Sequence, residues 1–298
     1  MTDRPIFIGI ATSGRREVLT ETLKELARQT RSPDHVFVCP AAPDDFDAEA
    51  AARLPLPITV VRSSRGTCHQ RNAILGALPE TADGLLIFFD DDFFPLPSYL
   101  AEVEALFDAG DDIVVASGLV LADGATGPGL SPEDARAIIG RAGDQGADRP
   151  PQPLYNGYGC NMTVRLRVIH AHGIRFDEDL PLYAWLEDVD LSRRMAAYGR
   201  IVGSATMRGV HLGSKRGRSS GLRFGYSQIA NPWHLLKKRT MRPDRALIQA
   251  ARNVAANIAG TVRPEPWIDR KGRLYGNALA LRDLCLGRLH PRNILEFE

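Results

Sequence analysis

The sequence lacks any apolar segment near the roughly 20 residues that are needed to span a bilayer. Only four of its 298 residues are cysteines, and they are spread out without a Cys-x-x-Cys pair. Free thiols in a reducing compartment fit this usage better than a disulfide framework or a zinc site. The first residues lead directly into a strand-like run, which leaves no room for a signal peptide. We therefore expect a cytoplasmic protein.

Strong charge of either sign is also missing. The formal net charge is +1, so the overall balance gives no reason to expect a nucleic acid or an acidic partner. No internal repeat, low-complexity tract or glycine-rich phosphate loop is evident. The composition is ordinary for a globular protein, with 44% hydrophobic and 24% charged residues. The length permits one large domain or two small ones.

The most distinctive stretch is a short apolar run, Leu85–Phe89, that stops at three consecutive carboxylates, Asp90, Asp91 and Asp92. Such a run is typical of a strand buried on both faces, and ligands of open α/β sheets lie beyond the carboxyl ends of these strands. Three neighbouring acids repel one another unless a cation shares the site, and a divalent metal holding a phosphorylated ligand is the simplest candidate. A solvated acidic turn is the alternative.

Apolar runs and helical spacings elsewhere predict an α/β fold. Up to residue 92 the order is strand, helix, strand, strand, helix, strand, which favours a parallel sheet with right-handed crossovers. The predicted strands are 6–11, 36–39, 58–61, 85–89, 113–118 and 155–164. The main predicted helices are 19–26, a short one through 74–75, and others over 97–107, 187–198, from 243 onward and 274–286.

A second acidic cluster, Glu187, Asp188 and Asp190, stands at the start of a helical pattern. Acids stabilise the amino terminus of a helix through its dipole, and Arg193 and Arg194 further along fit that interpretation. A carboxylate at a helix start can also serve as a general base when packing aims it into a cleft. The cluster alone does not decide between these roles.

The order of these motifs resembles that of family 2 glycosyltransferases, which are inverting nucleotide-sugar enzymes with a GT-A fold. The resemblance runs from about Pro5 to about Trp233. Phe88–Asp92 is similar to the strand end that carries the DXD motif, and Glu187–Leu191 to the Glu-Asp-x-Asp-Leu motif that supplies the base. The other matching segments are Ala11–Arg15, Arg65–Gly66, Arg71–Asn72, Gly159–Thr163, Phe176–Leu180 and His211.

The resemblance implies a Rossmann-like GT-A architecture with a mostly parallel central sheet flanked by helices. Residues 1–233 would form the glycosyltransferase domain, with a nucleotide-sugar half over about 1–118 and an acceptor half over about 119–233. Residues 234–298 would form a helical C-terminal extension. Arginines beside apolar stripes in this extension permit shallow attachment to a membrane surface that carries a lipid-linked acceptor, and ordinary domain packing explains the stripes equally well.

Roles for single residues follow from the same resemblance. Asp92 is expected to bind the metal directly, with Asp90 on the metal or the ribose and His211 near the metal or diphosphate. Mg²⁺ or Mn²⁺ fits this oxygen-rich set. Asp188 is the first choice for the base that accepts the acceptor's hydroxyl proton, and Glu187 comes next. The residues expected to bind the nucleotide sugar are Thr12, Ser13, Arg15, Arg71, Asp90 and Asp91.

One stretch departs from the family pattern. The second strand usually ends in an acidic turn that contacts the nucleobase, but Cys39–Ala42 stands there, with Asp44 and Asp45 as the nearest acids. The expected activity is metal-dependent, inverting transfer of a hexosyl group from a nucleotide sugar to a glycan or lipid-linked acceptor, in surface polysaccharide or glycoconjugate synthesis. A non-catalytic nucleotide-sugar-binding or scaffold protein of the same fold is the alternative, because the base-binding acid is missing.

Overall fold

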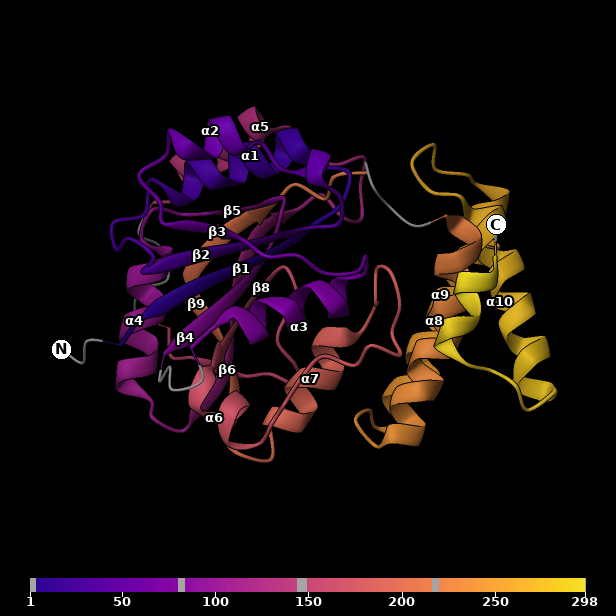
Figure 1. Cartoon of the computed structure of the whole chain (residues 1–298). Coiled ribbons are helices and arrows are strands. Elements are labelled where there is room, and N and C mark those ends of the chain that lie inside the picture. The colour runs from indigo at the N-terminus through magenta and orange to yellow at the C-terminus, as the bar shows by residue number, and fades with distance from the viewer. Residues whose placement is uncertain (1–3, 80–83, 144–148, 216–219, 298) are drawn as a thin grey trace.

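The computed structural model describes residues 4–79, 84–143, 149–215 and 220–297. A central sheet with helices on both faces makes up most of the molecule, and a group of C-terminal helices stands at one side of it (Figure 1). The nine strands that the structure describes all belong to this one sheet.

The first half of the sheet is parallel. Its elements are β1 Ile6–Thr12, α1 Arg16–Leu26, β2 His35–Pro40, the 3-10 helix Pro43–Asp45, α2 Ala48–Ala52, β3 Ile58–Val60, α3 Thr67–Ala77 and β4 Leu85–Asp90. Strands β3, β2, β1 and β4 lie side by side in that order, each parallel to its neighbour. The predicted parallel arrangement of this half is confirmed.

The second half of the sheet is mixed. Its elements are β5 Phe93–Pro95, α4 Tyr99–Ala109, β6 Ile113–Asp123, α5 Pro132–Arg141, β7 Gln152–Pro153, β8 Asn161–Arg165, α6 Leu166–Ala171, α7 Glu187–Met195 and β9 Arg200–His211. Strand β8 runs antiparallel between β4 and β6. Strand β9 pairs in parallel with β6 and antiparallel with β5 and β7.

Three predictions for this half differ from the structure. The strand expected over 155–164 begins only at Asn161, because the N–H groups of the preceding glycine-containing turn bond to side chains instead of a neighbouring strand. The helix expected to hold Glu187 in its first turn does begin there, but it ends at Met195 and does not reach Tyr198. Strand β9 has no counterpart among the predicted strands, because glycines and arginines interrupt its apolar pattern.

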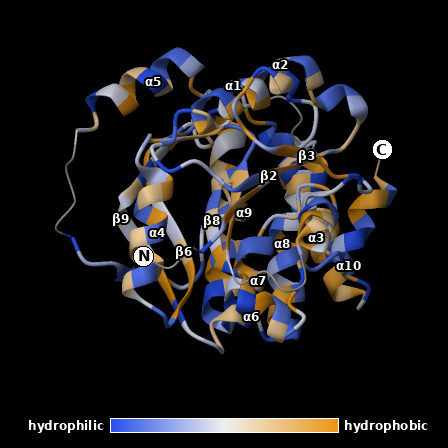
Figure 2. Ribbon diagram, turned by 60° about the vertical axis from the view of Figure 1, so that its left-hand side comes forward, coloured by the Kyte–Doolittle hydropathy of each residue, from blue (hydrophilic) through white to orange (hydrophobic). Residues whose placement is uncertain are grey.

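Alternation along the strands produces two apolar layers. Phe37 and Phe88 lie on the face that packs against α3, α6 and α7. Ile8, Ile10 and Phe89 lie on the opposite face, against α1 and α4. Successive strand residues point to opposite sides of a sheet, so strands covered on both sides have continuous apolar sequences. Figure 2 shows such hydrophobic stretches along β2 and β6.

The C-terminal region consists of α8 Gly221–Lys238, α9 Pro243–Val262, α10 Arg270–Cys285 and the 3-10 helix Pro291–Glu296. Helices α8 and α10 meet closely at Gly276, where a Cβ atom would lie 2.2 Å from the carbonyl oxygen of Leu222. Buried amides join the three helices, because Asn257 Nδ2 donates to Gln228 Oε1 at 2.7 Å and to Asn277 Oδ1 at 2.8 Å.

A helical C-terminal region is therefore present, as predicted. The predicted domain boundary after residue 233 falls inside α8, and the division into domains stays a prediction. Among the helices described, none has both the length and the apolar character of a bilayer-crossing segment.

Candidate active site

The three carboxylates at the end of β4 have different environments. Asp90 is partly exposed, whereas Asp91 and Asp92 are buried. Asp91 Oδ2 accepts a hydrogen bond from Thr12 Oγ1 at 2.6 Å, and its Oδ1 accepts one from Arg15 Nη1 at 2.8 Å. Burial raises the pKa of Asp91 to about 6, although Arg15 opposes this shift. Asp91 therefore fixes the end of β1 and the loop that follows it.

Asp90, Asp92 and His211 form a cluster of possible metal ligands. One ligand atom from each lies within 4.8 Å of the other two, and His211 Nε2 is 3.2 Å from Asp92 Oδ1. Asp92 Oδ2 accepts a hydrogen bond from the Ser214 amide at 2.7 Å, but its buried Oδ1 accepts none from the residues described. A buried carboxylate oxygen that faces an imidazole and lies near a second carboxylate fits the ligand preferences of Mn²⁺ and Mg²⁺.

A further carboxylate orients His211. His211 Nδ1 is 2.9 Å from Asp123 Oδ1, and Tyr158 Oη donates to Asp123 Oδ2 at 2.9 Å. Burial would lower the pKa of His211, but Asp123 and Asp92 raise it to about 10. The positive charge of the imidazolium thus offsets the negative charge of the neighbouring carboxylates. A bound divalent cation would supply this positive charge instead, and His211 would then be a neutral imidazole ligand.

The second acidic cluster reaches the first through Arg71. This buried guanidinium donates to Glu187 Oε1 at 2.8 Å, to Asp90 Oδ1 at 3.1 Å and to the Gly159 carbonyl at 2.8 Å. It also packs on the rings of Phe88 and Phe176, with its central carbon 5.2 and 5.4 Å from their centroids. Arg71 therefore holds the end of β4 and the start of α7 together.

Glu187 and Asp188 begin α7 side by side and have different partners. Burial, followed by repulsion from Asp188, raises the pKa of Glu187 to about 8, although Arg71 opposes this shift. Asp188 accepts hydrogen bonds from the Gly159 amide at 3.0 Å and the Val189 amide at 2.7 Å. Burial raises its pKa as well, against these two donors. A Cβ atom at Gly159 would lie 2.9 Å from Glu187 Oε1, so glycine permits this close approach.

The chain before α7 has an unusual backbone. Leu182, Ala184 and Leu186 have φ values of 56°, 53° and 77°, in the left-handed region that residues other than glycine seldom adopt. Tyr183 and Trp185 alternate with them, and both line the cavity described below. Strain of this kind is commonly retained where it positions functional side chains.

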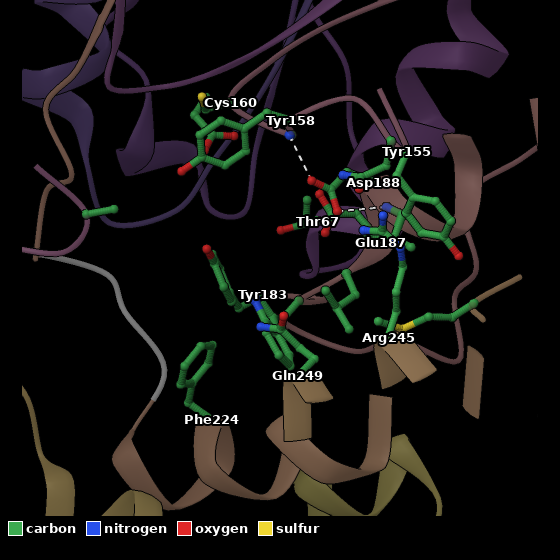
Figure 3. Close-up of a pocket in the computed structure, with 18 of the residues that line it drawn as sticks. Thr67, Tyr155, Tyr158, Cys160, Tyr183, Glu187, Asp188, Phe224, Arg245 and Gln249 are labelled. Atoms are coloured by element: carbon green, nitrogen blue, oxygen red, sulfur yellow. Dashed lines mark hydrogen bonds between the residues drawn. The ribbon is translucent and has the colours of Figure 1, made fainter. Parts of the chain in front are cut away.

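A cavity of about 780 Å³ connects these groups. Asp90, Glu187, Asp188 and His211 line one side of it, and residues of α8, α9 and α10 line the other. Figure 3 shows Glu187 and Asp188 above, with Phe224, Gln249 and Arg245 across the opening. An adjoining cavity of about 160 Å³ is lined by all six residues predicted to bind the nucleotide sugar: Thr12, Ser13, Arg15, Arg71, Asp90 and Asp91.

The structure also shows what stands in place of the missing acid after β2. Asp45 is engaged in local turns, because its side chain accepts from the Gly14 amide at 2.7 Å and the Ala42 amide at 3.0 Å. Gln70 Nε2 donates to the carbonyl of Thr12 at 2.9 Å and also to that of Cys39. The ends of β1 and β2 are therefore joined by an amide side chain that lines the smaller cavity.

Comparison with known proteins identifies the family. Residues 7–171 match the family described as glycosyl transferase family 2. The chain belongs to this family. It is thus a glycosyltransferase, as the sequence motifs predicted. No curated protein sequence is significantly similar to this glycosyltransferase.

Solved structures share the fold at low sequence identity. The mannosyltransferase PcManGT from Pyrobaculum calidifontis, in complex with GDP-Man and Mn²⁺, is 18% identical, with a TM-score of 0.56 over 99% of this chain and 86% of its own. Glucosyl-3-phosphoglycerate synthase from Mycobacterium tuberculosis, with Mn²⁺, UDP and phosphoglyceric acid, is 15% identical, with a TM-score of 0.53 over 81% and 80% of the chains. TarS of S. aureus is 17% identical, with a TM-score of 0.50. The match covers 76% of this chain but only 40% of TarS. These likenesses confirm the predicted fold class.

Several residues of the site carry no motif that would single them out. Asp123 and Tyr158 lie in ordinary stretches, and only pairing between distant strands brings Asp123 to His211. Arg245 and Arg252 are two among many arginines of the C-terminal region. Their positions in the cavity depend on how α9 packs, which local patterns do not reveal.

Proposed function

We propose that this glycosyltransferase is a metal-dependent, inverting hexosyltransferase that transfers a sugar from a nucleotide-sugar donor to a hydroxyl of a glycan or lipid-linked acceptor. The observation that carries this proposal is the Arg71 bridge, which places the possible metal ligands at the end of β4 beside Glu187 and Asp188 in one cavity. The fold neighbours that contain nucleotides and Mn²⁺ support it.

In this mechanism Asp188 takes the proton of the acceptor hydroxyl. The hydroxyl oxygen attacks the anomeric carbon in line, the bond from that carbon to the diphosphate breaks, and the electron pair leaves on the diphosphate, so the configuration inverts. Arg15 and Arg71 supply positive charge toward the donor, and Asp90, Asp92 and His211 would hold the metal. When bound, Mn²⁺ or Mg²⁺ supplies Lewis-acid stabilisation of the leaving diphosphate. Glu187 is the alternative base.

A panel of nucleotide sugars tests the proposal. We expect release of the nucleoside diphosphate from at least one donor with Mn²⁺, loss of this turnover with chelator, and recovery when Mn²⁺ is restored. A scaffold protein of the same fold is the second candidate, favoured by Cys39–Ala42 in place of the acidic turn. Nucleotide-induced stabilisation without turnover of any donor would favour the scaffold.

We also propose a role in surface polysaccharide or glycoconjugate synthesis at the cytoplasmic face of a membrane. Its support is the outer side of α9, where Leu247, Ile258 and Val262 are 73%, 52% and 79% exposed. Arg263 and Lys271 stand nearby in the sequence and would favour anionic lipid. Co-sedimentation with vesicles tests this contact, and equal recovery with neutral and anionic vesicles at low salt would contradict it.

A further inference from the structure

The wall of the large cavity that faces the acids is cationic. Arg245, Ile248, Gln249 and Arg252 of α9 all line the cavity, and their spacing places them on one side of the helix. Arg273 of α10 lines the same cavity. Two helices outside the matched family region thus present three guanidinium groups toward the site.

The charges of Arg245 and Arg252 on this wall are not neutralised by ion pairs among the described residues. Asp244 is the carboxylate that α9 contributes to the cavity, and Arg242 pairs with both of its oxygens at 3.0 Å. Asp244 is thus already paired, and Arg245 and Arg252 of the same helix line the cavity with their charge available. Arg71 on the opposite wall, in contrast, pairs with two carboxylates. The helical wall therefore has an excess of positive charge.

Aromatic rings hold two of these guanidinium groups in place. The central carbon of Arg245 lies 4.0 Å from the centroid of the Tyr155 ring, and that of Arg273 lies 4.5 Å from the centroid of Phe224. A guanidinium stacked on a ring keeps N–H groups at its edge, where they can bind an oxyanion in a bidentate manner. The stacking thus reduces the entropy that anion binding would cost.

A group of aromatic rings lies beside the cationic wall. Phe224 contacts both Tyr183 and Trp185, with ring centroids 5.8 Å apart in each pair. All three rings line the cavity, and Figure 3 shows Tyr183 and Phe224 on the side of Gln249. Aromatic surfaces of this kind accommodate the apolar face of a sugar ring or another flat apolar group.

We infer that α9 and α10 form an acceptor subsite for a phosphate ester, with the phosphate bound by Arg245 and Arg252 while the acceptor hydroxyl lies at Asp188. This inference rests on the proposed transferase function. The two guanidinium groups of α9 suit a phosphate, which offers more oxygens and charge than a carboxylate. The same chemistry occurs in soluble sugar phosphates and in lipid-linked phosphates, and the experiment separates these sources.

The first arm measures binding by calorimetry at constant ionic strength. The full-length protein is saturated with Mn²⁺ and the nucleoside diphosphate that stabilises it, and is then titrated with glucose 1-phosphate, glucuronate or glucose. We expect the phosphate ester to bind at least tenfold more tightly than glucose and more tightly than glucuronate. Arg252→Gln should weaken this binding about tenfold, because a charged hydrogen-bond donor is lost. The control Lys237→Gln, which removes an exposed positive charge on α8 outside the cavity, should change it less than twofold.

The second arm replaces the sugars by farnesyl phosphate and farnesol in detergent micelles, so that a lipid source of the phosphate is tested separately. A preference for the phosphate form in either arm that Arg252→Gln removes supports the inference. It is overturned if phosphate and neutral probes bind alike in both arms, if neither phosphate binds, or if Arg252→Gln and Lys237→Gln behave alike. Failure of the proposed function is distinct, because it would appear as a lack of turnover with every donor of the nucleotide-sugar panel, whether or not the phosphate probes bind.

Discussion

Replacing Asp188 by asparagine tests the assignment of the base with almost no change in shape. An amide cannot accept the proton of the acceptor hydroxyl, and base action typically contributes ~10²–10⁴-fold to a rate. We therefore expect Asp188→Asn to lose turnover by that factor, which corresponds to about 3–5 kcal/mol of activation free energy. The variant should still bind the donor, because Asp188 lies on the acceptor side of the Arg71 bridge.

The substitution also has a structural cost that the assay must separate. The carboxylate accepts hydrogen bonds from two backbone amides, Gly159 and Val189, whereas asparagine has a single acceptor oxygen. One amide loses its partner, at a cost of about 1–3 kcal/mol of folding stability. Initial rates are therefore measured at saturating donor, beside calorimetric nucleotide binding and thermal unfolding. Turnover within fivefold of wild type would refute the reasoning. A larger loss in Glu187→Gln than in Asp188→Asn would transfer the role of base to Glu187.

Three further predictions follow from the contacts around the site and in the helical region. Because the pKa of Glu187 is raised to about 8, the folded protein holds a proton that the unfolded chain releases above its ordinary pKa of 4.5. Stability should therefore fall as pH rises from about 4.5 to about 8, and urea unfolding at several pH values should show a flatter dependence in Glu187→Gln. Asp123→Asn should weaken Mn²⁺ binding about 10–100-fold, because His211 loses the carboxylate that orients it. A titration that follows the electron paramagnetic resonance signal of free Mn²⁺ measures this affinity, and an unchanged affinity would contradict the role of Asp123. Gly276→Ala should lower the free energy of unfolding by about 1–3 kcal/mol, because its Cβ would lie 2.2 Å from a backbone oxygen of α8. The control Gly140→Ala in α5 places its Cβ in open space and should be neutral or stabilising by up to about 1 kcal/mol. Similar unfolding midpoints for the two variants would refute the packing argument.

Much of the nucleotide side was predictable because its signals are local. The strand that ends at Asp90 is a continuous apolar run followed by acids, and the carboxyl ends of β1 and β4 lie together because these parallel strands pair. This pairing brings Thr12 to Asp91 at hydrogen-bond distance. The sequence therefore indicates both the residues and the edge of the sheet where they meet.

The acceptor side was less predictable because it depends on tertiary contacts. Nothing in the sequence between Leu182 and Leu186 indicates a backbone that alternates into the left-handed region, since no glycine marks it. The hydrogen-bond partner of His211 is Asp123 on the neighbouring strand β6. The pairing of β6 with β9 contains shifts of register, so the sequence does not reveal which residues lie opposite each other. The cationic wall depends on the packing of α9, whose repeating apolar pattern looks the same whether it covers a cavity or faces solvent.

The most direct test of the account measures nucleoside diphosphate release from a panel of nucleotide sugars by the wild-type protein, with Mn²⁺, with chelator, and with Mn²⁺ restored. At least one donor should be turned over with Mn²⁺, and the chelator should abolish this turnover until Mn²⁺ is restored. The reason is that Asp90, Asp92 and His211 would hold the metal in the cavity that Glu187 and Asp188 also line. Turnover that is indifferent to the chelator would contradict a metal-dependent mechanism. Absence of both turnover and nucleotide-induced stabilisation would contradict the transferase assignment for this cavity.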